Sequence, residues 1–327
     1  MYKLKEKPED FIVKEIPNFE IMEKGRYPIF LLKKINYTTE NAIKKIADYF
    51  HIKPKFIGYA GIKDKKAVTE QYISINILKK RFSSIKLSDI ELNFLGYNDE
   101  PVYLGRLKGN SFKIKVRNLK EPNIDKLRIK SEMLIPNLFG EQRFSKNNAN
   151  IGKLIIMKEF EKATKEIVKL KGNSEKLVDE HLKKHPHDYI GAIRKIQLKI
   201  RKLYIHSYQS ELFNRAALTY IEQTNSKKNL ELLIIGFGTE FKNKLIKEIY
   251  EKIMYEEGIT LRDFIIKGMQ ELSSTGFTRN LYIKVNDFKI INIEKDELNE
   301  GKKKVIVMFS LPKGCYATVV IDYLLRK

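Results

Sequence analysis

The sequence predicts an α+β protein whose sheet is built from both ends of the chain and is interrupted by a mostly helical insertion. Apolar and polar residues alternate, as in β-strands, within residues 1–36 and again at about 281–294 and 304–311. From about 151 to 222 the apolar residues recur at helical spacing instead. The chain has 327 residues, of which 43% are hydrophobic, so two interlocked domains with a substantial core are expected.

Local signals define the elements between these regions. Thr38 or Thr39 can cap a helix at about 39–50, whose apolar residues fall on one face. Gly61 to Lys66 form a loop, and a short strand is expected on each side of it. The expected strands are 56–60 and 71–77 around this loop and a pair within 101–117 that turns at Gly109-Asn110; an apolar segment at 316–325 ends the chain.

The charge of the chain indicates a polyanionic partner. Lys and Arg number 63 against 41 Asp and Glu, which gives a net charge of +22 and a pI near 9.6. This excess favours nucleic-acid binding, although a generally lysine-rich composition is the alternative. The single cysteine, Cys315, excludes an internal disulfide framework and a cysteine-based zinc site. No signal peptide or membrane-spanning run is recognisable, so a cytoplasmic protein is expected.

The segment with the densest chemical signal runs from Gly58 to Gln71, where Asp64 lies between Lys63 and Lys65 in a glycine-containing loop. Nearby cations favour an ionised carboxylate and attract phosphates, but an isolated sequence of this kind is often only a solvated turn. The whole segment closely resembles the signature of the TruD family of tRNA pseudouridine synthases, particularly its archaeal-type members. In that family's pattern the catalytic aspartate falls on Asp64.

Other segments resemble motifs of the same family in the same order along the chain. They are Lys5 with Pro8-Glu9-Asp10-Phe11, Gly109-Asn110-Ser111-Phe112, Pro136 to Phe144, Tyr208 to Asn214, and Leu311 to Thr318. The resemblance therefore covers most of the chain. It implies a pseudouridine synthase catalytic fold, with a mixed, mostly antiparallel sheet and flanking helices, over residues 1–154 and 266–327. An inserted domain of the kind found in this family is expected at 155–265.

The resemblance also implies an activity and a site. The family isomerises uridine to pseudouridine in tRNA, usually at uridine 13, and needs no cofactor or metal. The carboxylate of Asp64 would either attack the anomeric carbon or assist removal of a ribose proton. By the family pattern Lys5 pairs with Asp64 across the cleft, Phe139 stacks on the detached uracil, and Asn137 fixes the polar edge of the base or the local loop. Phe11 is expected in the core or in the wall of the cleft.

Basic residues outside the motifs are candidates for contact with tRNA phosphates. A solvated surface is the alternative interpretation for the run between 190 and 202, and the sequence does not separate the two. The candidates are Lys63, Lys65, Lys66, Arg143, Arg194, Lys195, Lys199 and Arg201.

Two further signals are weighed and set aside. His181, His185 and His187 lie close together beside acidic residues, but Pro186 interrupts their helical spacing, so no metal site is expected there. Gly236-Phe237-Gly238 lacks the frame of a dinucleotide-binding motif and is expected to be a loop. A catalytically inactive RNA-binding protein of the same fold and a metal-dependent nuclease or hydrolase acting on RNA are the alternative functions.

Overall fold

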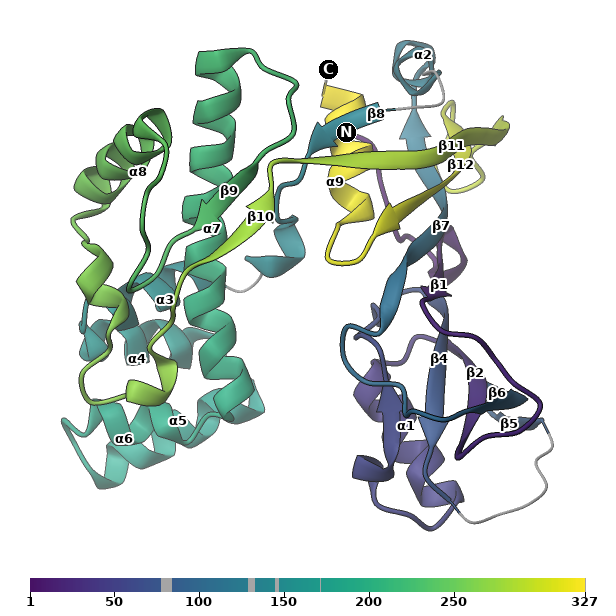
Figure 1. The fold of residues 1–327 in the computed structure, drawn as a ribbon, viewed down its shortest axis with the longest axis horizontal. Coiled ribbons are helices and arrows are strands. Elements are labelled where there is room, and N and C mark those ends of the chain that lie inside the picture. The colour runs from purple at the N-terminus through teal and green to yellow at the C-terminus, as the bar shows by residue number, and fades with distance from the viewer. Residues whose placement is uncertain (78–83, 129–132, 145–146, 171, 327) are drawn as a thin grey trace. The chain divides into compact units, whose positions relative to one another are not determined.

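The structure is a computed structural model that describes residues 1–77, 84–128, 133–144, 147–170 and 172–326 (Figure 1). The chain forms two compact units. Unit 1 consists of Met1–Ile135 and Lys284–Lys327, and unit 2 of Pro136–Ile283. Unit 1 is therefore built from both ends of the chain, and unit 2 from the segment between them.

Unit 1 contains a large mixed sheet. Within the described residues, ten strands form it in the order β5-β6-β2-β4-β1-β7-β12-β11-β8, with β3 paired to β4. The central pair β1 and β4 is parallel, whereas β2 with β4 and β1 with β7 are antiparallel. The predicted fold class is thus confirmed. The strands are β1 (Phe11–Pro17), β2 (Tyr27–Ile35), β3 (Ile57–Tyr59), β4 (Val68–Ile75), β5 (Ile85–Leu87), β6 (Ile90–Asn98), β7 (Leu107–Leu119), β8 (Met133–Pro136), β11 (Tyr282–Lys295) and β12 (Lys303–Pro312).

Helix α1 (Thr39–Tyr49) covers one part of this sheet. Its first turn is capped by Thr38, whose Oγ1 accepts a hydrogen bond from the N–H of Asn41, as the sequence predicts. The apolar face of the helix packs on β2, β4 and β6 because those strands present buried aliphatic and aromatic side chains to it. The other helical segments of unit 1 are η1 (Pro8–Asp10), η2 (Pro54–Phe56), α2 (Glu121–Leu127) and α9 (Ala317–Arg326).

Unit 2 is mostly helical and is organised around the long helix α7 (Leu198–Thr224). Helix α3 (Asn148–Ile156) approaches α7 closely at Gly152, where an added Cβ would lie 2.1 Å from the carbonyl oxygen of Tyr204. The remaining elements are η3 (Glu141–Arg143), α4 (Phe160–Lys169), α5 (Asn173–Lys184), α6 (Tyr189–Arg194), β9 (Glu231–Ile234), α8 (Lys244–Glu257), η5 (Leu261–Phe264), η6 (Gln270–Leu272) and β10 (Phe277–Asn280). Strands β9 and β10 pair with each other in a small antiparallel sheet.

The chain divides between the two compact units at 135/136 and 283/284, because α3 packs on α7 and β10 pairs with β9. The domain boundaries expected from the sequence, at 154/155 and 265/266, stay a prediction. The structure corrects one local expectation. Gly109-Asn110 is not a turn but lies inside β7, opposite Ile16 and Glu15 of β1. Glycine is required at 109 for another reason: a Cβ there would lie 2.1 Å from the carbonyl oxygen of Leu311 on β12.

Gly236-Phe237-Gly238 lies outside the helices and the named strands, as the sequence predicts for a loop. Among the described residues, no helix combines the length and the apolar character needed to span a membrane.

Candidate active site

Asp64 lies in unit 1, in the loop that joins β3 to β4. Its carboxylate oxygen Oδ2 is 2.7 Å from the Nζ of Lys5, so the ion pair predicted from the sequence is present. Both side chains remain partly accessible, with 25% of Asp64 and 20% of Lys5 exposed. The ion pair therefore holds the Asp64 carboxylate in one orientation and leaves it accessible to a substrate.

Buried polar side chains hold the main chain of this loop through hydrogen bonds. The N–H of Lys63 donates to Thr39 Oγ1 at 2.9 Å, and this hydroxyl donates in turn to Gln71 Oε1 at 3.0 Å. The Gln71 amide then donates to the carbonyl of Gly61 at 3.2 Å. Thr39 and Gln71 are fully buried, so these hydrogen bonds are shielded from water and fix the path of the loop.

Lys63 does not have the surface position expected of a phosphate contact. Its side chain is only 6% exposed, and its ammonium forms an ion pair with the fully buried carboxylate of Glu15 on β1. The N–H of Tyr72 also donates to Glu15, at 3.2 Å. Lys63 therefore ties the Asp64 loop to the sheet, whereas its neighbours Lys65 and Lys66 are exposed.

A second lysine beside Asp64, Lys34, is not among the residues predicted from the sequence. It lies on β2, is fully buried, and donates to the carbonyl oxygens of Asp64 at 3.0 Å and Tyr37 at 2.6 Å. A signal was available, because Phe30, Leu32 and Lys34 share the buried phase of the strand alternation. A lysine in that phase is unusual.

The N-terminal segment that carries Lys5 is fixed by its surroundings. Lys5 has a positive φ of 57°, and its Nζ lies 4.1 Å from the centroid of the Phe11 ring. Phe11 is 2% exposed and makes an edge contact with Phe112, so its ring belongs to the core and also supports the Lys5 ammonium.

A buried ionic cluster holds the residue before Phe11. The guanidinium of Arg117 on β7 donates to both carboxylate oxygens of Asp10 at 2.8 Å and to Asp296 at 2.8 Å. Burial alone would raise the pKa values of these two aspartates, but hydrogen bonds, including those from Arg117, hold both below the ordinary value. The cluster joins the segment after Lys5 to β7 and to the turn between β11 and β12.

Asn137 and Phe139 lie in unit 2, not in the unit that carries Asp64. The Nδ2 of Asn137 donates to the carbonyl of Asn280 at 2.9 Å, and its N–H donates to Leu281. Arg279 on β10 donates to the carbonyl and to the Oδ1 of Asn137, at 2.9 and 2.6 Å. Asn137 is 6% exposed, so its amide is used within unit 2 to fix this loop.

The Phe139 ring is held by its main chain and by its neighbours. Asn214 on α7 accepts from the N–H of Phe139 at 2.8 Å and donates to its carbonyl at 2.9 Å. The ring makes an edge contact with Phe213, with centroids 5.6 Å apart, and the Arg279 guanidinium lies 4.2 Å from its centroid. Arg279 therefore contacts both Asn137 and Phe139, although it is not among the residues predicted from the sequence.

The basic residues predicted to contact RNA fall into two groups. Lys195 and Lys199 are exposed, as that role requires. Arg201 is buried, where it bonds Glu271 at 2.6 Å and the carbonyl of Ile196. Arg194 is exposed but donates to the carbonyl of Gly268 at 2.7 Å and lies beside the same Glu271. Arg194 and Arg201 thus serve the packing of unit 2.

Arg143 lies beside the Phe139 ring. It is half-buried, donates to Ser210 of α7 at 3.2 Å, and has its guanidinium 5.5 Å from the centroid of Phe139. Arg143, which is among the residues predicted to contact RNA, therefore lies beside the Phe139 ring.

The clustered histidines make hydrogen bonds and ring contacts with neighbouring side chains. His181 bonds Asp188 at 2.8 Å, and its ring lies tilted against that of His185, with centroids 4.9 Å apart. In the part of the chain that the structure describes, no three His, Cys, Asp or Glu residues are grouped as a metal site requires. The implied absence of a metal stays a prediction.

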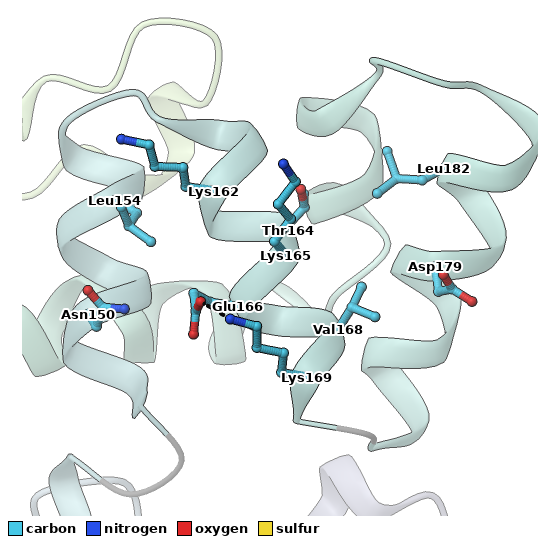
Figure 2. A pocket seen from close by; sticks show the side chains of 10 residues that line it. All are labelled: Asn150, Leu154, Lys162, Thr164, Lys165, Glu166, Val168, Lys169, Asp179 and Leu182. Atoms are coloured by element: carbon cyan, nitrogen blue, oxygen red, sulfur yellow. Dashed lines mark hydrogen bonds and ion pairs between the residues drawn. The ribbon is translucent and has the colours of Figure 1, made fainter.

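A pocket of 660 Å³ lies in unit 2 among α3, α4 and α5, and Figure 2 shows the side chains that line it. Three of them are Lys162, Lys165 and Lys169 of α4, and each forms an ion pair with a glutamate three or four residues away. Glu166 and Asp179 also line the pocket. None of the predicted site residues does, so this pocket is not the candidate site.

Comparison with known proteins finds relatives over nearly the whole chain. The family model described as tRNA pseudouridine synthase D (TruD) matches residues 2–176, 169–231 and 219–323. A protein of Methanococcoides burtonii named "Probable tRNA pseudouridine synthase D" is 30% identical and is aligned over 98% of this chain and 92% of its own. The "tRNA pseudouridine synthase D" of Aquifex aeolicus is also 30% identical, over 98% of this chain and 97% of its own.

A solved structure gives the same result for the fold. The crystal structure of a putative tRNA pseudouridine synthase D from Methanosarcina mazei is similar with a TM-score of 0.76 and 28% identity. The match covers 99% of this chain and 93% of that one. With the family model matching nearly the whole chain, this protein belongs to the TruD family.

Proposed function

We propose that this protein isomerises a uridine of tRNA to pseudouridine and that Asp64 is the catalytic carboxylate. Membership of the TruD family supports the reaction and the tRNA substrate. The observation that carries the residue assignment is the 2.7 Å ion pair between Lys5 and a partly exposed Asp64. A carboxylate fixed in this way is suited to act on a substrate, because its orientation is set before binding.

The reaction needs little more than such a group. Pseudouridine formation breaks the N-glycosidic bond of uridine, turns the base and rejoins it to the ribose through carbon, with no net change in oxidation state. A carboxylate can attack the anomeric carbon or assist removal of a ribose proton, and Asp64 is proposed for this step. Lys5 would hold the carboxylate while its charge is redistributed.

Phe139 is proposed to stack on the uracil once the base is detached from the ribose. The ring is 9% exposed and the Arg279 guanidinium lies 4.2 Å from its centroid, so stacking of the base would require this guanidinium or the ring to move. Of the two roles considered for Asn137, its hydrogen bonds to Asn280 and Arg279 support the fixing of the loop. Phe11 would support Lys5 from the core.

The finer identity of the substrate is proposed from the family pattern. The target would be uridine 13 of tRNA, and the mostly helical unit 2 would place the folded tRNA. Exposed lysines in both units, including Lys65 and Lys66 beside Asp64 and Lys195 and Lys199 in unit 2, would contact its phosphates.

The direct test is Asp64→Asn, which keeps the shape of the side chain and removes its charge. Single-turnover pseudouridine formation on an unmodified tRNA transcript should fall roughly a thousandfold or more, while the tRNA affinity stays within a few-fold. Pseudouridines should be mapped at nucleotide resolution, so that a product at a position other than 13 corrects the target without affecting the reaction. Comparable turnover in the variant would rule out Asp64.

Two controls separate the alternative functions. A wild-type protein that binds tRNA but forms no pseudouridine would support an inactive RNA-binding protein. Treatment with EDTA should leave the activity unchanged when the tRNA is kept folded with monovalent salt or spermidine. A loss that only added metal restores would favour metal-dependent chemistry instead.

A further inference from the structure

The packing of the sheet does not require a lysine at position 34. Lys34 follows Phe30 and Leu32 on the face of β2 that packs against α1, and all three side chains are fully buried. An aliphatic side chain would serve the core at this position, because lysine is seldom fully buried unless its charge is paired. The adjacent Lys33 lies in the opposite phase of the strand, 36% exposed and 3.3 Å from Glu91.

The ammonium of Lys34 is directed at the loop that carries Asp64. The hydrogen bonds that it donates to described residues end on main-chain carbonyls, on Tyr37 at 2.6 Å and on Asp64 at 3.0 Å. Lys5 holds the other end of the same residue, through the carboxylate oxygen Oδ2. Asp64 is thus held at its main chain and at its side chain by lysines that come from different segments.

We propose that Lys34 is a positioning residue for the reaction, whose buried positive charge holds the Asp64 loop and its carboxylate in the reactive arrangement. This inference rests on the proposed function of Asp64. Lys34 would not touch the substrate. It would act through the carbonyl of Asp64 and through the field that its charge exerts on the carboxylate.

The charges around Lys34 support a functional role for its ammonium. Burial lowers the pKa of Lys34 to about 8; the negative charge of Asp64 opposes this shift and the positive charge of Lys63 adds to it. Of the other charged groups nearby, Glu15 on β1 is paired with Lys63, and Lys5 with Asp64. The cross-strand neighbours of Lys34 are Thr69 on β4 and Ile90 on β6, which carry no charge. The field of Asp64 is therefore the main one that favours the protonated form.

The test compares Lys34→Met with Lys33→Met, which removes the same charge from the opposite face of the same strand. Single-turnover rate and tRNA affinity should be measured at pH 7. We expect Lys34→Met to lose roughly a hundredfold in rate with tRNA affinity within about threefold, and Lys33→Met to match the wild type in both. A Lys34→Met rate within about threefold of wild type would overturn the inference.

The pH dependence separates a charge from a purely structural contact. As the pH rises from 7 to 9.5, wild-type Lys34 passes through its pKa of about 8 and loses its charge. The ratio of wild-type to Lys34→Met rates should therefore shrink, whereas a role in packing alone would leave it constant and overturn the inference. If Lys34→Met does not fold, Lys34→Arg keeps its charge over this range, and its rate relative to wild type should rise. A flat ratio there would again contradict the inference.

The result for Asp64→Asn keeps this inference distinct from the proposed function. If Asp64→Asn is active, the proposed function fails whatever the Lys34 variants do. If Asp64→Asn is inactive and Lys34→Met reacts at the wild-type rate, only the role of Lys34 fails.

Discussion

The loops that carry Asp64 and Phe139 are held in different ways. The Asp64 loop of unit 1 is fixed by charged groups, namely Lys5, Lys34 and the Lys63–Glu15 pair, in addition to the buried hydrogen bonds of Thr39 and Gln71. The Phe139 loop of unit 2 is fixed by the Asn214 amide and by Arg279, whose guanidinium bonds Asn137 and covers the aromatic ring.

Because of this difference, we expect different substitutions to disturb the two loops. A loop built on buried charges is sensitive to the loss of a partner, because an unpaired buried ion is costly. The Phe139 loop should lose less when one group is removed, because the Arg279 guanidinium bonds uncharged groups of Asn137. A neutral buried group left without its partner costs about 1–3 kcal/mol, less than an unpaired buried ion.

The largest effect on stability is expected from Arg117→Met in unit 1. It leaves Asp10 and Asp296 buried without their cation, which should lower the free energy of unfolding by about 3–5 kcal/mol at pH 7. Denaturant titrations measure this, with Arg128→Met as a control, because Arg128 is exposed and, among the described residues, pairs with Asp125 three residues away. A change below about 1 kcal/mol in Arg117→Met would contradict the buried-charge account of unit 1.

The difference in unfolding free energy between wild type and Arg117→Met should depend on pH in a definite direction. The folded-state pKa values of Asp10 and Asp296 lie below the ordinary 3.8. Their contribution to stability is therefore complete above about pH 3.8 and is lost as the pH falls through the lowered values. The difference between wild type and Arg117→Met should shrink in acid, and a difference that grows there would show that other groups are responsible.

Lys5→Met should have the next largest effect, on the rate. Loss of the ammonium leaves the Asp64 carboxylate without its side-chain partner, and a decrease of roughly a hundredfold in single-turnover rate is expected. Lys3→Met removes the same charge from an exposed lysine paired with Glu6 and should leave the rate unchanged. Equal rates for the two variants would remove Lys5 from the site.

Arg279→Met tests the Phe139 loop. It removes two hydrogen bonds to Asn137 and the contact with the Phe139 ring, about 2 kcal/mol in all, or roughly 30-fold in kcat/KM. Arg262→Met, also in unit 2 but on an exposed residue, provides the control. The comparison between the two loops would fail if Arg279→Met reduced kcat/KM more than Lys5→Met does.

The smallest effect is expected from the exposed lysines of unit 2. Replacing Lys195 and Lys199 together by Ala should weaken tRNA binding a few-fold and reduce the slope of log affinity against log salt by about 1–2. The control replaces Lys244 and Lys247 on α8, which removes the same charge from another exposed face. Identical slopes for the two double variants would mean that unit 2 has no localised RNA surface.

Sequence reasoning was most successful where local pattern and short motifs carry the information. The strands around the Asp64 loop, the Thr38 cap of α1 and the Lys5–Asp64 pair are all present. It gave no indication of interactions that depend on distant segments. Lys63 was a candidate for phosphate contact and is paired with Glu15 on β1. Arg201 was a candidate for RNA contact or for a solvated surface and is bonded to Glu271.

The sequence by itself determined the fold class, the family and the loop that carries Asp64, because alternation, helical spacing and contiguous motifs are local properties of a chain. Only the tertiary structure decided which groups the buried charges are paired with and which elements share a unit. Phe139 belongs to unit 2 because Asn214 and Arg279, which are distant in sequence, hold its main chain and ring. Lys34 lies against Asp64 for the same physical reason: sheet pairing brings β2 beside β4, and the carbonyl of Asp64 in the β3–β4 loop accepts a hydrogen bond from Lys34.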